Sequence, residues 1–188
     1  MSQKLSEALK GCAEIPLFFV AGVYRFENTQ EAAKKSFLIA LLFLLAQTFM
    51  AQVNPDFQNL SYGEIFFRFS SSFLLYCSFY LPAIYMAAKQ LGRDEFFPRF
   101  VSIFNWINIT TFCIMSPLWM AVNMEKYTWD EAYPFLICLD LYAYCYFAFT
   151  LSTVFRINWM LGAALSILGM ACDEFSRFII YDLVFNDR

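Results

Sequence analysis

Five charged residues lie inside long apolar stretches of this 188-residue chain, and they have the most obvious chemical potential. They are Arg68, Asp140, Asp173, Glu174 and Arg177. A charge near the centre of a bilayer costs about 2.5–3.5 kcal/mol even on the mildest scale, so such residues are usually paired or functional. The functional interpretation is a proton or ion path along the carboxylates. The structural interpretation, which the mixture of acids and bases favours, is a network that joins helices.

The spacing of these residues predicts that they share one depth. Asp173 and Glu174 precede Arg177 by four and three residues, so either carboxylate can pair with it along one helix. Arg68, Asp140 and Arg177 each lie about 6–7 residues, or roughly 10 Å, from the same end of three different predicted helices. We therefore expect Asp140 to bridge to Arg177 or Arg68, which leaves one carboxylate over. That carboxylate should be protonated, face water or meet a partner subunit.

Other polar residues carry weaker signals. Asn105 and Asn108 are three residues apart and share a helix face, where they can line a polar pocket or, more commonly, bond to another helix. Gly162, Ala163, Ser166 and Gly169 give the last predicted helix a small-residue face that permits close helix approach. Three tyrosines alternate around the preceding helix and predict packing and lipid contacts: Tyr142, Tyr144 and Tyr146.

No motif points to an enzyme or to a bound cofactor. The sequence has no Walker loop, no G-x-G-x-x-G and no G-x-S-x-G, and the absence of His rules out H-E-x-x-H. The six Cys show no C-x-x-C spacing. The cluster Cys172-Asp173-Glu174 is a poor metal site, because neighbouring residues on a helix point apart. We expect no catalytic residue, no metal and no cofactor.

The composition is that of an integral membrane protein. The chain is 60% hydrophobic and 21% aromatic, and only 15% of it is charged, against about a quarter in soluble domains. A formal net charge of -3 argues against nucleic acid as a partner. Membrane lipids are therefore the expected surroundings, and the fold class is all-α.

Capping patterns and apolar runs divide the chain into two parts. Residues 1–30 contain a short polar helix and the run Ile15–Phe26, which is too short to span about 30 Å of hydrocarbon and is expected at the inner interface or as a re-entrant segment. Residues 31–188 form the membrane domain. Capping boxes are expected at Asn28–Glu31, Ser61–Glu64 and Thr128–Glu131, and Asn158 can cap the last helix. The five predicted transmembrane helices cover about 32–53, 62–88, 97–121, 131–155 and 159–184.

The distribution of basic residues orients these helices. The turn Leu91–Arg99 joins two apolar segments and is flanked by lysine and arginine, which places it in the cytoplasm. Only Lys126 and Arg188 fall in outer segments. The N-terminus is then cytoplasmic and the C-terminus outside. Nine of the 13 basic residues fall on the inner side: Lys4, Lys10, Arg25, Lys34, Lys35, Lys89, Arg93, Arg99 and Arg156.

The stretch from Ala32 to Leu183 resembles small five-helix bacterial membrane proteins of the Yip1-like type. The resemblance rests on EAAKKSF before the first span, on PAIYMAAKQLGRDEFFPRFVSIFNW across the inner turn, and on the acidic end of the fifth. It implies a helical bundle in a bacterial inner membrane. The eukaryotic proteins of this type act in membrane trafficking with small GTPases, but their Asp-Leu-Tyr-Gly-Pro stretch is absent here, so that activity does not carry over.

Two functions remain in competition. A non-catalytic accessory or scaffold subunit of a larger membrane assembly is favoured by the short loops, the lack of cofactor ligands and the aromatic surface. The partners would then be other membrane-protein subunits. The alternative is a small transporter or channel that uses the buried carboxylates. Transporters usually show broken helices in corresponding halves, whereas here only the second span is clearly interrupted, at Pro82.

Overall fold

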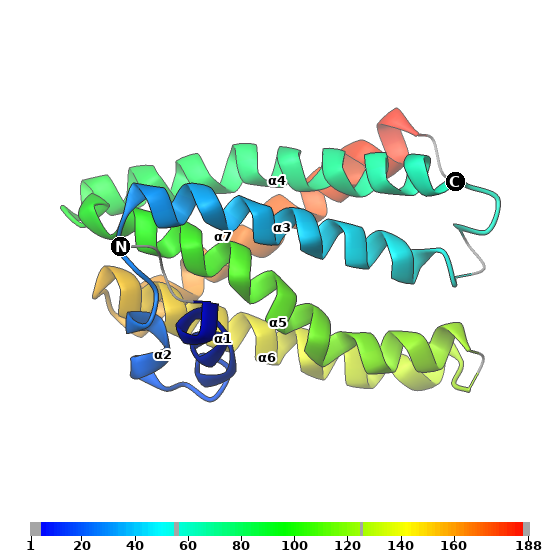
Figure 1. The fold of residues 1–188 in the computed structure, drawn as a ribbon, viewed down its shortest axis with the longest axis horizontal. Helices are drawn as coiled ribbons and strands as arrows, with labels where there is room; N and C mark the ends of the chain where they lie inside the picture. The colour runs from blue at the N-terminus through cyan, green and yellow to red at the C-terminus, as the bar shows by residue number, and fades with distance from the viewer. Residues whose placement is uncertain (1–4, 55–56, 125, 186–188) are drawn as a thin grey trace.

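The computed structural model describes residues 5–54, 57–124 and 126–185, and every regular element within those ranges is helical. Two short helices come first and five long ones follow (Figure 1). A 3-10 turn, η2, precedes α5, and a π-helical turn, η3, continues α7. The elements are α1 (Leu5–Glu14), α2 (Val20–Tyr24), α3 (Gln30–Ala51), α4 (Tyr62–Gln90), η2 (Asp94–Phe96), α5 (Phe97–Asn123), α6 (Trp129–Phe155), α7 (Trp159–Arg177) and η3 (Phe178–Val184).

Local capping determines where several of these helices begin. The capping boxes at Ser61 and Thr128 are both confirmed. Each hydroxyl accepts from the backbone N–H of the glutamate three residues on, and the glutamate side chain accepts from the backbone N–H of the capping residue. Asn158 caps α7 as expected. The predicted cap at Asn28 is wrong, because Thr29 caps α3 by accepting from the backbone N–H of Ala32.

Asn28 serves a tertiary contact in place of a cap. Its side chain donates to the carbonyl oxygen of Glu95 at 2.8 Å and accepts from the backbone N–H of Arg99 at 3.1 Å. The Arg99 Nε also donates to the carbonyl oxygen of Phe26 at 3.0 Å. The segment before the first long helix is thus tied to the basic turn, a link that capping rules alone do not predict.

The five long helices alternate in direction along one bundle (Figure 1). One end carries the connections 27–29, 91–96 and 156–158, and we call it the basic end. Its charge comes from Lys34, Lys35, Lys89, Arg93, Arg99 and Arg156. The other end carries the last residues of α3 and α5 and the first residues of α4 and α6, and we call it the open end. Lys4 and Arg188 lie outside the described residues.

Among the described residues, four helices are long and apolar enough to cross a membrane: Gln30–Ala51, Tyr62–Gln90, Asp94–Asn123 and Trp129–Phe155. The outward face of α3 is lined by exposed large apolar residues such as Leu38, Leu42 and Phe49. An all-α fold with four helices long and apolar enough to span a membrane is therefore confirmed. The fifth predicted span corresponds to α7 and η3, which carry three of the charged residues and are not among the four.

Aromatic rings fill the half of the bundle next to the basic end. Tyr80, Phe100, Phe104 and Phe155 are almost fully buried, and the rings of Phe100 and Phe155 lie 5.5 Å apart. In a membrane, helices associate through close packing and hydrogen bonds, because lipid tails are as apolar as the side chains. The interlocked rings therefore supply the contact area that holds α4, α5 and α6 together.

The predicted small-residue face of α7 is where that helix contacts its neighbours. A Cβ placed on Gly162 would lie 2.6 Å from the carbonyl oxygen of Ala148, on α6. A Cβ on Gly169 would lie 3.0 Å from the ring of Tyr80, on α4. The Ser166 hydroxyl donates to the carbonyl oxygen of Tyr144 at 3.2 Å. Larger side chains at these positions would push α7 away from the bundle.

Residues 5–26 form a helical hairpin against the bundle. α1 and α2 are 10 and 5 residues long, so neither can span a bilayer. They cross closely, because a Cβ on Gly11 would lie 2.9 Å from the carbonyl oxygen of Gly22. Ile15 and Phe26 are buried in the same core as the aromatic rings. The Tyr142 hydroxyl, from the middle of α6, donates to the Pro16 carbonyl oxygen at 2.7 Å.

Candidate functional site: a charged cavity in the bundle

A cavity of about 550 Å³ runs between the five long helices. Asn54, Asn123 and Trp129 border it at the open end, and Phe104 and Phe147 border it in the middle of the bundle. In Figure 1 the ribbons of α3 and α5 diverge toward the open end. Both helices contribute lining residues to the cavity in that half. The cavity therefore occupies the half of the bundle that the aromatic core does not fill.

Four of the five predicted charged residues line this cavity. Asp140 comes from α6, and Asp173, Glu174 and Arg177 come from α7. The Arg177 Nη2 lies 2.8 Å from the Asp173 Oδ2, which is the pairing expected along the helix. The structure thus brings α6 and α7 together at one side of the cavity. We call this side, formed by Asp140, Asp173, Glu174 and Arg177, the acidic wall.

The expected bridge from Asp140 is absent. Within the described residues Asp140 makes no ion pair within 4.0 Å, either with Arg177 or with Arg68. Asp140 is exposed to the cavity and interacts with Arg177, Glu174 and Asp173 only at longer range. Because the cavity admits water, the carboxylate does not need a direct partner to avoid hydrocarbon.

Glu174 also makes no ion pair among the described residues. The wall therefore carries two carboxylates without an ion pair, where the sequence predicted one. Both residues are exposed and line the cavity, and whether each is protonated, faces water or meets a partner subunit stays a prediction.

Arg68 is placed differently from the other four charges. It lies on α4, is 8% exposed and does not line the cavity. Its guanidinium carbon lies 4.5 Å from the ring centroid of Phe185. Arg68 consequently stabilises the packing between α4 and the end of the chain that the structure describes, and the acidic wall is left with one cation among the described lining residues.

The two asparagines predicted to share a role have separate ones. The buried Asn105 side chain donates through Nδ2 to the Ser36 hydroxyl at 2.8 Å, which joins α5 to α3. This is the interhelical bond that the sequence favoured. Asn108 donates to the carbonyl oxygen of Phe104 in its own helix at 3.0 Å and lines the cavity.

The aromatic lining of the cavity was missed at the level of sequence. Tyr144 and Tyr146 both line it, although the alternation of tyrosines predicted only packing and lipid contacts. A single-helix stripe was the wrong criterion, because the rings come from α3, α4, α5, α6 and η3 and from the loop before α4, and converge only in the fold. The aromatic lining residues are Phe43, Phe57, Phe69, Phe73, Tyr76, Phe104, Phe112, Trp119, Trp129, Tyr144, Tyr146, Phe147 and Tyr181.

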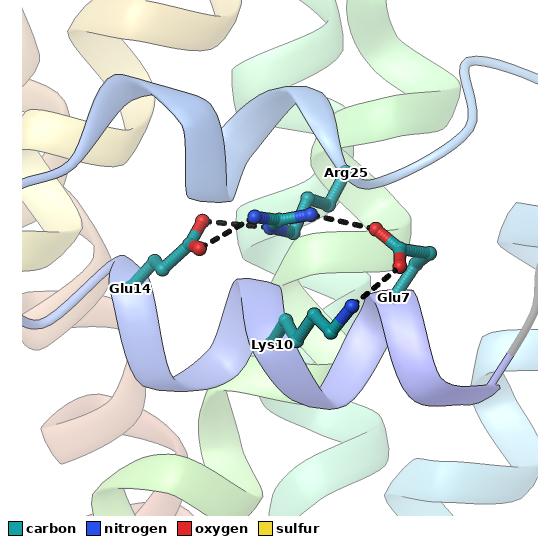
Figure 2. A network of polar contacts seen from close by, with 4 residues as sticks. All are labelled: Glu7, Lys10, Glu14 and Arg25. Carbon is teal, nitrogen blue, oxygen red and sulfur yellow. Dashed lines mark hydrogen bonds and ion pairs between the residues drawn. The ribbon is translucent and has the colours of Figure 1, made fainter.

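A second charge cluster lies on the N-terminal hairpin, and we call it the clamp (Figure 2). The Arg25 guanidinium donates through two nitrogens to the Glu14 carboxylate at 2.6 and 2.7 Å, and through a third to Glu7 at 2.7 Å. Lys10 donates to the other oxygen of Glu7 at 3.1 Å. The sequence placed Lys10 and Arg25 at the membrane surface without pairing them with these acids.

The clamp shifts the titration of its acids. Hydrogen bonds from Lys10 and Arg25 hold the pKa of Glu7 below its ordinary value, and those from Arg25 do the same for the pKa of Glu14. The same contacts raise the pKa of Arg25. Glu7 and Glu14 are therefore held ionised beside Arg25, and the formal charges of the cluster, Lys10 included, sum to zero.

No protein family profile matches this chain, and neither a curated protein nor a solved structure is similar to it. The resemblance to Yip1-like proteins consequently stays a prediction.

Proposed function

We propose that the chain is an integral membrane protein with five spans, of which α7 is the last. α7 has 19 residues, or about 28 Å of helix, close to the roughly 30 Å thickness of the hydrocarbon core. Basic residues gather at one end, which supports a cytoplasmic position for that end in a bacterial inner membrane. The N-terminal hairpin then lies in the cytoplasmic half, as an interfacial or re-entrant element.

Reporter fusions at Arg93 and after Arg188 test this topology. A cytoplasmic reporter should be active at Arg93 and inactive after Arg188. Activity at both positions would mean an even number of spans between them and would remove α7 from the membrane.

We propose that the cavity binds a positively charged solute for transport or conduction. This is the function that the cavity supports best. The main support for this proposal is the acidic wall. There Asp140 and Glu174 line the cavity and make no ion pair among the described residues. The Asp140 and Glu174 carboxylates repel each other electrostatically, so a cation that comes near both is attracted by both. Low-dielectric walls strengthen that attraction.

Fluorescence titration of the purified protein tests this function, because Trp119 and Trp129 line the cavity. Inorganic and organic cations are titrated separately, and at least one of them should change the emission saturably. The variant Asp140→Asn combined with Glu174→Gln should lose that response. The matched control is Glu95→Gln, which removes an exposed acid at the basic end. A response that the double variant retains would contradict the proposal.

The second candidate is the accessory or scaffold subunit that the sequence favoured. The same observation supports it: Asp140 and Glu174 are exposed and make no ion pair among the described residues, so a cationic side chain from a partner helix would satisfy them. Purification in mild detergent separates the two functions. A stoichiometric membrane partner, lost on Asp140→Asn, would favour the subunit. A protein that purifies alone and responds to cations would favour the transporter or channel.

A further inference from the structure

The chemical class of the cation can be argued from the rest of the cavity, given the proposed function. The acidic wall forms one side of the cavity, and its residues come from α6 and α7. Rings border the remaining space, among them Tyr76 on α4 and Trp119 on α5. The faces of tryptophan and tyrosine carry negative charge density and attract cations that have lost part of their hydration.

An inorganic ion fits this environment poorly. Metal cations bind in proteins where several oxygens converge at short distances, with six to eight for calcium. No group of three or more acidic or cysteine side chains that could hold a metal ion occurs in the parts of the chain described. A small ion would thus have to keep its water shell against largely aromatic walls.

The size of the cavity fits an organic molecule. A volume of about 550 Å³ lies inside the range of roughly 300–1,000 Å³ that is typical of sites for drug-sized ligands. Such sites are mostly apolar with a few well-placed polar groups, which matches one acidic wall within an aromatic lining. Tyr144, one helical turn beyond Asp140, also lines the cavity and places a ring next to a carboxylate.

We propose that the cavity binds a lipophilic organic cation, a quaternary or protonated amine or a phosphonium with an apolar or aromatic body. Asp140 and Glu174 are its charge partners, and the rings of α4, α5 and α6 surround the body. The ligand enters from the open end, since the cavity ends at the aromatic core in the other half of the bundle.

Equilibrium dialysis of the full chain in detergent, with radiolabelled tetraphenylphosphonium as the probe, tests the proposal. We expect saturable binding that excess unlabelled probe displaces. Triphenylphosphine oxide, which has a similar aromatic body without charge, should displace it at least tenfold less well. Asp140→Asn and Glu174→Gln should each weaken binding about tenfold, and Glu95→Gln should not. Size-exclusion profiles confirm that each variant remains folded.

The outcomes separate this inference from the function on which it rests. If sodium, potassium or magnesium changes the tryptophan emission and tetraphenylphosphonium does not bind, the organic class is wrong while a cation site remains. Equal displacement by the neutral oxide would show that the carboxylates play no part in binding. If no cation binds at all, both proposals fail. A single acid variant that folds and binds normally would remove that residue from the site.

Discussion

The two charge clusters of this protein solve the same physical problem in opposite ways. The clamp on the N-terminal hairpin pairs Glu7 and Glu14 with Arg25 at 2.6–2.7 Å, and its charges cancel. The acidic wall leaves Asp140 and Glu174 without ion pairs in the described structure and exposes them to a cavity. Neither cluster is fully buried, because the side chains of Glu7 and Arg25 are 38% and 29% exposed and that of Arg177 is 55% exposed. Charges that keep access to water do not require partners, so burial does not force the pairing in the clamp. The clamp joins α1 to the segment after α2, whereas the carboxylates of the wall remain available to the cation that we propose.

The packing of the long helices also differs between the two halves of the bundle. In α6 the buried residues between Tyr146 and Phe155 cluster next to the basic end, and Ala132 alone among the described residues of the other half is buried. α5 shows the same division, with a continuous buried run from Phe100 to Ile107. Tight packing in one half fixes the helices, and their separation in the other half makes room for the cavity.

The largest effect should come from disturbing the tight half. Gly162→Ala places a Cβ against the backbone of α6, and overpacking of this kind typically costs about 1–3 kcal/mol. Gly63→Ala is the matched control, because a Cβ there meets nothing within 4 Å. Thermal unfolding in detergent measures both variants. Equal melting temperatures would mean that α6 and α7 are not held as closely as described.

Breaking the clamp should have the next largest effect, and a local one. Arg25→Gln leaves Glu7 and Glu14 without their shared guanidinium, so the hairpin should open more often. Hydrogen exchange should become severalfold faster in residues 5–26 and stay unchanged in α6 and α7. Arg93→Gln removes a basic residue from the nearby turn as a control. Faster exchange throughout the bundle would show that the hairpin is not an independent unit.

Acid should weaken the clamp as well. The pKa values of Glu7 and Glu14 are lower in the folded protein than their ordinary value of 4.5. Their contribution to stability is therefore fully present above about pH 5 and is lost as the pH falls through the lowered values. The melting temperature of the wild type should exceed that of the Glu7→Gln, Glu14→Gln variant at neutral pH, and the difference should shrink toward pH 3. A constant difference would exclude this coupling.

The smallest effect concerns the boundary between the two halves. Asn105→Ala removes the bond to Ser36, and such interhelical bonds average about 0.6 kcal/mol in membranes. Asn108→Ala removes only a bond within its own helix, so its effect on stability should be smaller still. Thermal unfolding in detergent measures both variants. If Asn108→Ala lowered stability more than Asn105→Ala, Asn108 would have a structural role at the cavity beyond its bond to Phe104.

The sequence predicted the helices well, because their determinants are local. Apolar length and the caps at Ser61 and Thr128 located α3, α4, α5 and α6 to within about two residues. The cap at Asn158 located the start of α7, but the predicted end at 184 includes the π-helical turn η3 that follows Arg177. The pair Asp173–Arg177 was equally predictable, since both residues lie on one helix. The missing Asp140 bridge was not, because residue depth along a helix says nothing about the distance between helices. The cavity and the clamp depend on tertiary contacts between segments that no periodicity connects.

The position of the hairpin has a consequence for how the chain is made. The Tyr142 side chain that bonds Pro16 lies 126 residues further along, so the hairpin's docking surface is synthesised long after the hairpin itself. At about 5–20 residues per second, the hairpin waits roughly 6–25 s for that surface. The clamp joins residues only 11 and 18 apart and can close as soon as they emerge. A nascent chain can thus present a preformed, electrically neutral hairpin to a bundle that is completed around it later.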